Sequence, residues 1–155
     1  MKQGETASNI ALLAPVPLVH LISGCTTAEN EGKVAFGSRA WEVFRQLDNE
    51  RKDLPVDVYI YASHSDDRRA VASWRARYVR KVETSTGVYP DDPRYRPPST
   101  ANDDQDHFAL YWEVEDLHRL PDHEHIGLTN FTGYGKKRAY GRDFVPEGPL
   151  LVEHP

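Results

Sequence analysis

Cysteine and long apolar runs are scarce in this sequence, and each absence excludes a class of protein. Cys25 is the only cysteine among 155 residues, so no intrachain disulfide is available. This composition is typical of a reducing compartment, and we predict a cytoplasmic protein. The longest apolar stretch, residues 10–22, is interrupted by Pro15, Pro17 and His20. It is shorter than the roughly 20 residues that a transmembrane helix needs, so no membrane partner is expected.

Positive charge is also in short supply. The chain carries 19 lysine and arginine residues against 24 aspartate and glutamate residues, which gives a formal net charge of −5. A protein that coats duplex DNA non-specifically relies on massed Lys and Arg, so the charge argues against this class. A hydrophobic content of 39%, with 3 Trp, 8 Tyr and 5 Phe, argues against a disordered chain. The length fits one domain over residues 1–155.

Alternating side chains predict the centre of the fold. In residues 56–63 and again in residues 108–115, large apolar side chains occupy every second position, which is the period of a half-buried strand. Residues 72–83 lie between these segments and carry Trp74, Ala76 and Tyr78 on one face. We therefore expect three neighbouring antiparallel strands.

Prolines, glycines and helix caps predict the flanking elements. We expect a strand over 9–14 that ends at Pro15 and Pro17, a helix over 18–23 that ends at Gly24, an extended stretch over 32–38, a helix over 39–49, a short helix over 122–124 and a last strand after Pro146. Many short strands with few helices favour an α+β fold. We predict a small bent or closed β-barrel flanked by two or three short helices.

Residues 84–105 differ in composition from the rest of the chain. They contain Pro90, Pro93, Pro97 and Pro98, several aspartates and almost no aliphatic side chains. A long segment without regular structure in a compact domain is usually a lid, a binding loop or a mobile insert. We predict a mobile insert, and the alternative interpretation is a surface for protein–protein interaction.

Motifs of common catalytic and cofactor sites are absent. The sequence contains no G-x-S-x-G, no P-loop and no G-x-G-x-x-G. His118, His123 and His125 are close in sequence, but their spacing matches neither a helical His-x-x-x-His pair nor a structural zinc site. We therefore expect no metal and no cofactor.

Four places in the chain carry a family resemblance. They are residues 18–24, residues 56–63 with 74–79, residues 128–135, and the closing strand after Pro146. Their order resembles the PUA-like superfamily, especially its ASCH and EVE branches. The resemblance implies a single PUA-like domain, a barrel with flanking helices, and recognition of RNA or of a modified base in a cleft between barrel and helices.

The ASCH branch also implies an alternative function. ASCH domains often carry G-x-K-x-x-E-x-R after the first helix; here Gly24 and Glu29 match, whereas Thr26 and Glu31 replace the Lys and the Arg. The alternative is a small amidohydrolase or ribonuclease that acts on modified nucleosides or RNA. Its catalytic residues would be Lys33, Thr26 and Glu29, with a Thr or Cys nucleophile and Lys33 as the base.

Arginine and aromatic residues are interleaved in the most basic part of the chain. Residues 68–82 contain 6 Arg or Lys residues and no Asp or Glu. Arginines at alternate strand positions can follow a phosphate backbone, and aromatic rings offer faces to unstacked bases. We predict a nucleic-acid site formed by Ser38, Arg39, Trp41, Ser63, Arg75, Arg77, Asn130, Phe131 and Tyr134.

These residues have different expected roles. The three arginines would neutralise phosphate, Trp41 and Phe131 would stack on bases, and the Ser and Asn side chains would read a base edge. Our preferred hypothesis is a non-catalytic module that binds RNA, or a single strand with a modified or unpaired base, in a cleft beside the barrel. A pocket lined jointly by Trp41, Ser63 and Asn130 is the arrangement we expect.

Overall fold

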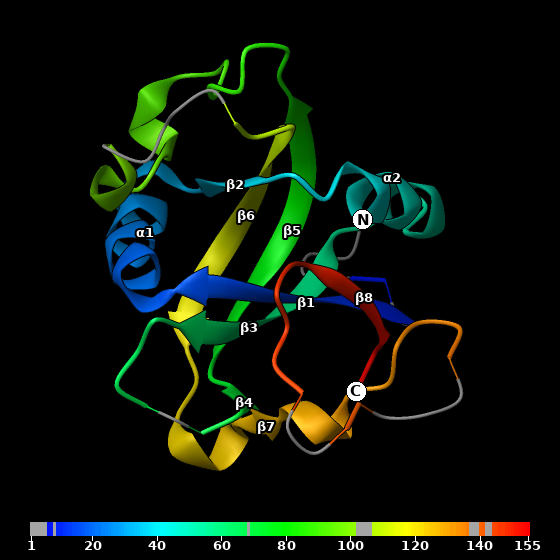
Figure 1. Ribbon diagram of the computed structural model, residues 1–155. Helices are drawn as coiled ribbons and strands as arrows, with labels where there is room; N and C mark the ends of the chain where they lie inside the picture. Colours follow the sequence, from blue (N-terminus) through cyan, green and yellow to red (C-terminus); the bar gives the residue numbers. More distant parts are fainter. Residues whose placement is uncertain (1–5, 8, 68, 102–106, 137–139, 142–143) are drawn as a thin grey trace.

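The protein has an α+β fold built on a six-stranded mixed sheet, described here from a computed structural model (Figure 1). The structure describes residues 6–7, 9–67, 69–101, 107–136, 140–141 and 144–155. Its strands are β1 (Ile10–Pro17), β2 (Val34–Ser38), β3 (Val56–Ser63), β4 (Val71–Ala72), β5 (Trp74–Glu83), β6 (Leu110–Arg119), β7 (Ile126–Gly127) and β8 (Leu150–Glu153). Its helices are α1 (Leu18–Glu31), α2 (Trp41–Glu50) and the short 3₁₀ helices η1 (Pro93–Tyr95), η2 (Pro98–Thr100), η3 (Asp122–Glu124) and η4 (Leu128–Asn130). No helix within the described ranges is long and apolar enough to cross a membrane.

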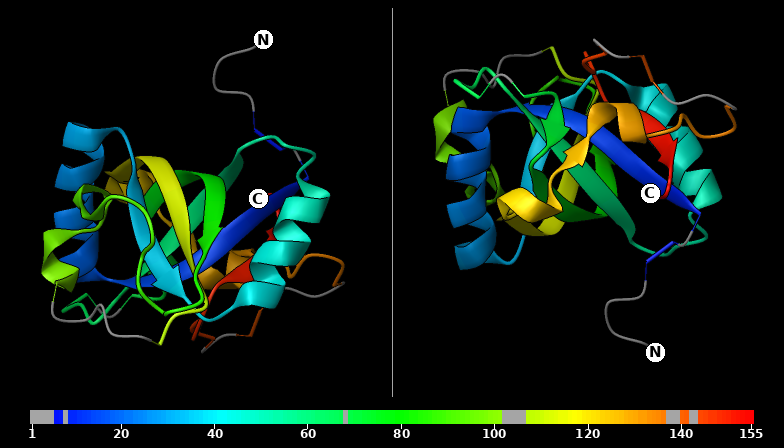
Figure 2. Two further views of the ribbon diagram at one scale, coloured as in Figure 1. Left: turned by 90° about the horizontal axis from the view of Figure 1, so that it is seen from above. Right: turned by 90° about the horizontal axis from the view of Figure 1, so that it is seen from below.

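The strand order β2-β6-β5-β3-β1-β8 places β2 and β8 at the two edges of the sheet. β1 runs parallel to β3, and the other neighbours are antiparallel. Figures 1 and 2 show β5 and β6 curving across the direction of β1 and β3, with the two α-helices at opposite ends. The α+β class and the antiparallel neighbours β3, β5 and β6 are thus confirmed. The described strands form an open, curved sheet and not a closed barrel.

The first strand is longer than its sequence predicts. It continues through Pro15 and Pro17, because both residues keep their register with β3, opposite Tyr61 and Ser63. Proline cannot donate a backbone hydrogen bond, so it is tolerated where one side of a strand has no partner. β8 pairs with β1 only as far as Leu13, so the second half of β1 has no described strand partner on the side away from β3.

Helix α1 is likewise longer than predicted, because Gly24 does not end it. This glycine is buried, and a Cβ atom added to it would lie 3.1 Å from the ring of Phe36. Close packing therefore explains the glycine, and the helix continues to Glu31. It ends at Gly32, whose φ of 87° is the left-handed conformation common after a helix.

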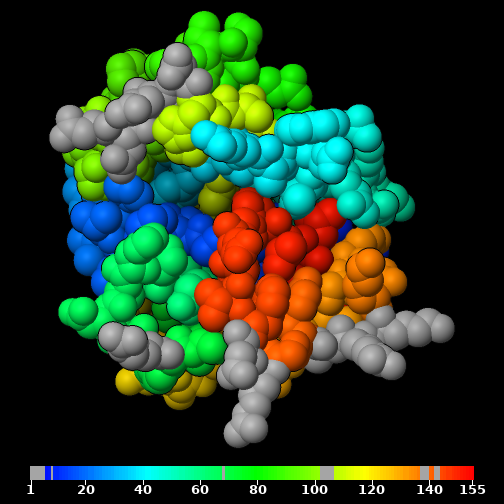
Figure 3. Space-filling view, in the orientation of Figure 1, coloured from blue at the N-terminus to red at the C-terminus, as the bar shows by residue number. Residues whose placement is uncertain are grey.

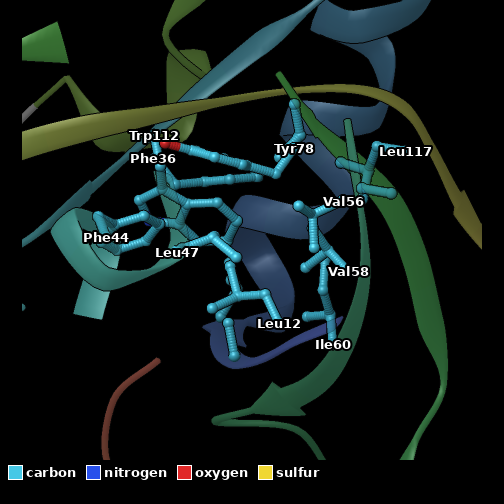
Figure 4. Close-up of a cluster of buried hydrophobic side chains, with 14 of the residues drawn as sticks. Leu12, Phe36, Phe44, Leu47, Val56, Val58, Ile60, Tyr78, Trp112 and Leu117 are labelled. Atoms are coloured by element: carbon cyan, nitrogen blue, oxygen red, sulfur yellow. The ribbon is translucent and has the colours of Figure 1, made fainter. Parts of the chain in front are cut away.

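Alternation along the strands separates two hydrophobic clusters. Val58 and Ile60 of β3 belong to the main core cluster, whereas Tyr59 between them belongs to a second cluster. In the main cluster, the ring of Phe44 from α2 lies 5.7 Å from Tyr78 and 5.8 Å from Trp112, measured between centroids (Figure 4). The strand period predicted from the sequence is therefore the period that fills the core.

The segment predicted as an insert packs against the sheet in its described part, residues 84–101. It contains η1 and η2, and the side chains of Tyr89, Arg96 and Thr100 are buried. The expectation of a stretch without regular structure is therefore wrong for these turns. The Tyr89 ring packs against Tyr111 and Arg96 donates to the carbonyl of Ala35, so the segment is held with almost no aliphatic side chains of its own. Residues 102–105 lie outside the described residues, and the mobility of the segment stays a prediction.

Candidate functional site

A cavity of about 570 Å³ opens between the second half of β1 and the strand β2. Figure 3 shows the surface hollowed there, between the blue β1–α1 region, the cyan β2–α2 region and the orange-red segment that leads into β8. Small-molecule sites in proteins have volumes of roughly 300–1,000 Å³. The cavity therefore has the size of a ligand site.

Beyond Leu13, β1 pairs with no described strand on the side away from β3, and the cavity lies beside this part of β1. Pro15 and Pro17 form this wall, and neither residue offers a backbone N–H with which another strand could pair. On the opposite side, β2 is an edge strand of the sheet. The cavity lies between these two segments.

Aromatic side chains form the floor and one wall of the cavity. Phe36 of β2 and Trp112 of β6 lie at its base, with 4% and 2% of their surface exposed and their ring centroids 5.2 Å apart. Phe108 lies against Gly37, where an added Cβ would be 2.7 Å from the ring. Only glycine leaves room for Phe108 in this position, so the backbone of β2 itself shapes the wall.

Polar groups lie at the end of β2. The Ser38 hydroxyl accepts a hydrogen bond from the backbone N–H of Ala40 over 3.0 Å, and Arg39 donates through Nε to the carbonyl of His107 over 2.9 Å. No residue in the described ranges forms an ion pair with Arg39. The guanidinium of Arg39 is exposed at the cavity and is available to an anionic group.

A second arginine of the cavity, Arg96, is 7% exposed. It donates to the carbonyl oxygen of Ala35 over 2.6 Å, and its guanidinium lies 4.9 Å from the centroid of the Tyr111 ring. Through these contacts Arg96 joins the 84–101 segment, to which it belongs, to β2 and β6 of the sheet. Because η1 and η2 flank Arg96 and Thr100 also lines the cavity, this segment contributes to the site.

The structure brings together only part of the predicted nucleic-acid site. Ser38 and Arg39 line the cavity, and Trp41 follows directly after the lining residue Ala40, with 49% of its surface exposed. By contrast, Arg75 pairs with Asp57 at 3.0 Å, and Arg77 pairs with Glu115 at 3.2 Å. Both arginines of β5 are thus engaged by carboxylates of the neighbouring strands β3 and β6.

The remaining predicted residues lie elsewhere. Phe131 is 1% exposed within the second core cluster, and the Tyr134 hydroxyl donates to Glu50 over 3.1 Å. Ser63 ends β3, and Asn130 is an exposed residue of η4. Neither Ser63 nor Asn130 lines the 570 Å³ cavity, so the expected pocket with Trp41, Ser63 and Asn130 together is not the cavity that the described residues form.

The residues of the alternative, catalytic hypothesis also lie apart. The Lys33 ammonium is bound to Glu113 at 2.9 Å and lies over the ring of Tyr95. Thr26 and Glu29 are exposed on α1, and among the described residues no hydrogen bond or ion pair joins either to Lys33. Burial, with Glu29 nearby, raises the pKa of the Cys25 thiol, which disfavours the nucleophilic thiolate.

The clustered histidines have separate surroundings. His118 interacts through Nδ1 with the backbone carbonyl of Asp116, and His125 interacts through Nε2 with the carbonyl of Leu120. His123 is exposed. Within the described ranges, no group of three or more His, Cys, Asp or Glu side chains is arranged to hold a metal ion.

Sequence reasoning missed the aromatic and proline walls of the site. Trp112 belongs to the main core cluster, in line with the alternation over residues 108–115, and it also lines the cavity. The available signal was the pair Pro15 and Pro17 within an otherwise buried strand, because prolines in a strand indicate an unpaired edge. Nothing local in sequence connects Arg96 to this edge.

Comparison with known proteins adds no relative. No family model, no curated protein and no solved structure matches this chain. The membership in the PUA-like superfamily therefore stays a prediction from the sequence, and the candidate site is described by its own residues.

Proposed function

We propose that the protein is a nucleic-acid-binding module that takes an unpaired or modified base, first of all from RNA, into the cavity between β1 and β2. The observation that carries this proposal is the meeting of Ser38 and Arg39 with the aromatic walls of Phe36 and Phe108 in one cavity. The sequence predicts both polar residues for a nucleic-acid site, Ser38 at the edge of a base and Arg39 at a phosphate.

The chemistry of the walls fits a base. A base removed from its stack needs apolar or aromatic faces beside it and polar groups at its edge. Phe108 and the prolines of β1 supply such faces, and the Ser38 hydroxyl supplies a polar group. The exposed ring of Trp41 lies next in sequence to the cavity and offers a stacking face to a neighbouring base.

The charge distribution favours recognition of a short unit over coverage of a long strand. Arg75 and Arg77 are paired with carboxylates, whereas Arg39 has no ion-pair partner among the described residues. A site for one nucleotide needs few cations, so it is compatible with the net charge of −5.

The PUA-like assignment belongs to the same proposal. The resemblance of the sequence supports it, and so does a curved sheet with a cavity between sheet and helices. The open gap between β1 and β2 replaces the closed barrel that the family implies.

Removal of the aromatic wall tests the proposed function. Phe108→Ala is expected to weaken binding of a fluorescent single-stranded RNA by about tenfold or more, because stacking of one base contributes about 1–3 kcal/mol. Phe144→Ala is the matched control, since Phe144 stacks on Tyr140 outside the cavity. Fluorescence anisotropy with RNAs that carry unmodified and modified bases measures the effect. Equal losses in the two variants, or no binding by the unsubstituted protein, would contradict the proposal.

The catalytic alternative is tested in the same samples. The recovered RNA and acylated nucleosides should be chemically unchanged after incubation, as mass spectrometry would show. Turnover that disappears in Thr26→Ala would overturn the non-catalytic reading. Thr26 is exposed on α1, so this substitution tests chemistry without disturbing the core.

A further inference from the structure

We infer that the cavity between β1 and β2 holds a complete phosphorylated nucleotide and not the base alone, with the phosphate bound beside Arg39. This inference rests on the proposed function and names the ligand class more narrowly. It predicts that a nucleoside monophosphate, free or at the end of a strand, binds where the corresponding nucleoside binds poorly.

The size of the cavity is the first argument. Its volume of about 570 Å³ lies within the range of pockets that enclose drug-sized ligands. A flipped base fills only part of such a space, and the remainder must be filled by ligand or water. A base with its sugar and phosphate fills more of this space than a base alone.

The charge of the lining is the second argument. The chain as a whole is acidic, with a net charge of −5, yet the exposed guanidinium of Arg39 lines the cavity and forms no ion pair within the described ranges. Helix α1 begins at the cavity with Pro17 as its N-cap residue, and its first turn contains no acidic residue. An arginine without an ion pair in the described ranges and the N-terminus of α1 therefore both lie at the cavity where the phosphate is placed.

The fixed position of Arg39 is the third argument. Arg39 donates through Nε to the carbonyl of His107 at 2.9 Å, and this hydrogen bond holds its guanidinium in place. The two terminal nitrogens of the guanidinium have no hydrogen-bond partner among the described residues. A side chain held in this way binds an anion with a smaller loss of conformational entropy. Arg96 and His20 also line the cavity, but they are engaged by the carbonyl of Ala35 at 2.6 Å and by the Ser99 hydroxyl at 2.7 Å, so the phosphate is assigned to Arg39. Guanidinium groups suit phosphate because they can donate two parallel hydrogen bonds.

Isothermal titration calorimetry with matched ligand pairs tests the inference. For the unsubstituted protein, we expect at least one nucleoside monophosphate to bind about tenfold or more tightly than its nucleoside, since hydrogen bonds between charged groups are the stronger class. Arg39→Ala should remove most of this advantage and leave nucleoside binding unchanged. Arg45→Ala is the control, because Arg45 is exposed on α2 over the Trp41 ring and does not line the cavity.

Several outcomes would overturn the inference. Equal affinities for nucleotide and nucleoside would show that the cavity does not bind the phosphate. An equal loss of affinity for both ligands in Arg39→Ala would show that the phosphate does not lie beside Arg39. Competition by inorganic phosphate as strong as that by the nucleotide would show that the base does not contribute to binding. If RNA with a 5′-hydroxyl binds while mononucleotides do not, the inference fails and the proposed function stands. If neither binds, the proposed function itself fails.

Two oligonucleotides then separate the sources of the nucleotide. A strand with a 5′-phosphate and the same strand with a 5′-hydroxyl differ only in the terminal phosphate. Tighter binding of the phosphorylated strand, lost in Arg39→Ala, assigns the cavity to a strand end. Equal binding of the two strands, together with a preference for mononucleotides over nucleosides, assigns it to a free nucleotide.

Discussion

The buried carboxylate of Glu113 is the residue on which the described part of the 84–105 segment depends most. Its side chain is 0% exposed and accepts hydrogen bonds from Lys33 at 2.9 Å, from Arg80 at 2.6 Å and from Tyr89 at 2.6 Å. Arg80 also pairs with Asp91 at 3.0 Å. One acidic residue of β6 thus connects β5, the start of β2 and the segment that contributes Arg96 to the cavity.

Replacement of Glu113 by Gln is expected to lower the free energy of unfolding by about 2 kcal/mol, because two cations and one hydroxyl lose a charged acceptor. The loss stays this small because Lys33 and Arg80 are partly exposed and solvent screens their charges. Urea denaturation followed by circular dichroism measures it. Glu83→Gln, which removes an exposed partner of Lys81, should leave the urea midpoint unchanged. A similar shift in both variants would argue against a special role for Glu113.

The same carboxylate gives the stability a pH dependence. Burial alone would raise the pKa of Glu113, but the hydrogen bonds from Arg80, Tyr89 and Lys33 outweigh burial and hold the pKa below its ordinary value. A group with a lowered pKa stabilises the folded state above its unfolded pKa of about 4.3, and the stabilisation is lost as the pH falls through the folded pKa. The difference in unfolding free energy between the protein and Glu113→Gln should therefore shrink from pH 7 to pH 3. A constant difference would contradict this account.

At the scale of elements, Tyr89 attaches the 84–101 segment to the sheet. Its ring lies edge-on to Tyr111 at 5.1 Å and is 7% exposed. Tyr89→Ala should reduce the unfolding free energy by about 3 kcal/mol, the usual loss for a buried aromatic ring, and expose the segment locally. Faster cleavage by trypsin after the exposed Arg94 would measure this release. Val88→Ala is the control, since 44% of Val88 is exposed, and equal cleavage of both variants would contradict the prediction.

The sequence predicts those elements whose side chains have one clear period. β3 has the bounds that its alternation predicts, and α2 and η3 begin and end within two residues of theirs. The prediction is wrong where a glycine or proline serves packing or an edge. Gly24 lies inside a helix because Phe36 approaches it, and Pro15 lies inside a strand because one side of β1 has no described partner there. Such contacts link residues far apart in sequence, so local patterns do not contain them.

The candidate site is predicted less completely than the fold, for the same reason. Ser38 and Arg39 are the two predicted site residues that line the cavity, and they lie at the end of β2 and directly after it. Arg75 and Arg77 look like phosphate ligands in sequence, but their acidic partners come from β3 and β6. A basic run without nearby acids in sequence can therefore be neutral in the folded chain.

At the scale of the whole molecule, this neutralisation predicts a shallow salt dependence of RNA binding. Each phosphate contact to a single strand lowers the logarithm of the association constant by about 0.7 per tenfold increase in salt. With Arg39 as the principal phosphate ligand, we expect a slope between about −0.7 and −1.4, the value for one or two phosphates. Arg77→Ala should change neither the slope nor the affinity, because Arg77 is engaged by Glu115. A slope steeper than about −3, made shallower by Arg77→Ala, would show that β5 follows the backbone of the strand and that the cavity is not the principal site.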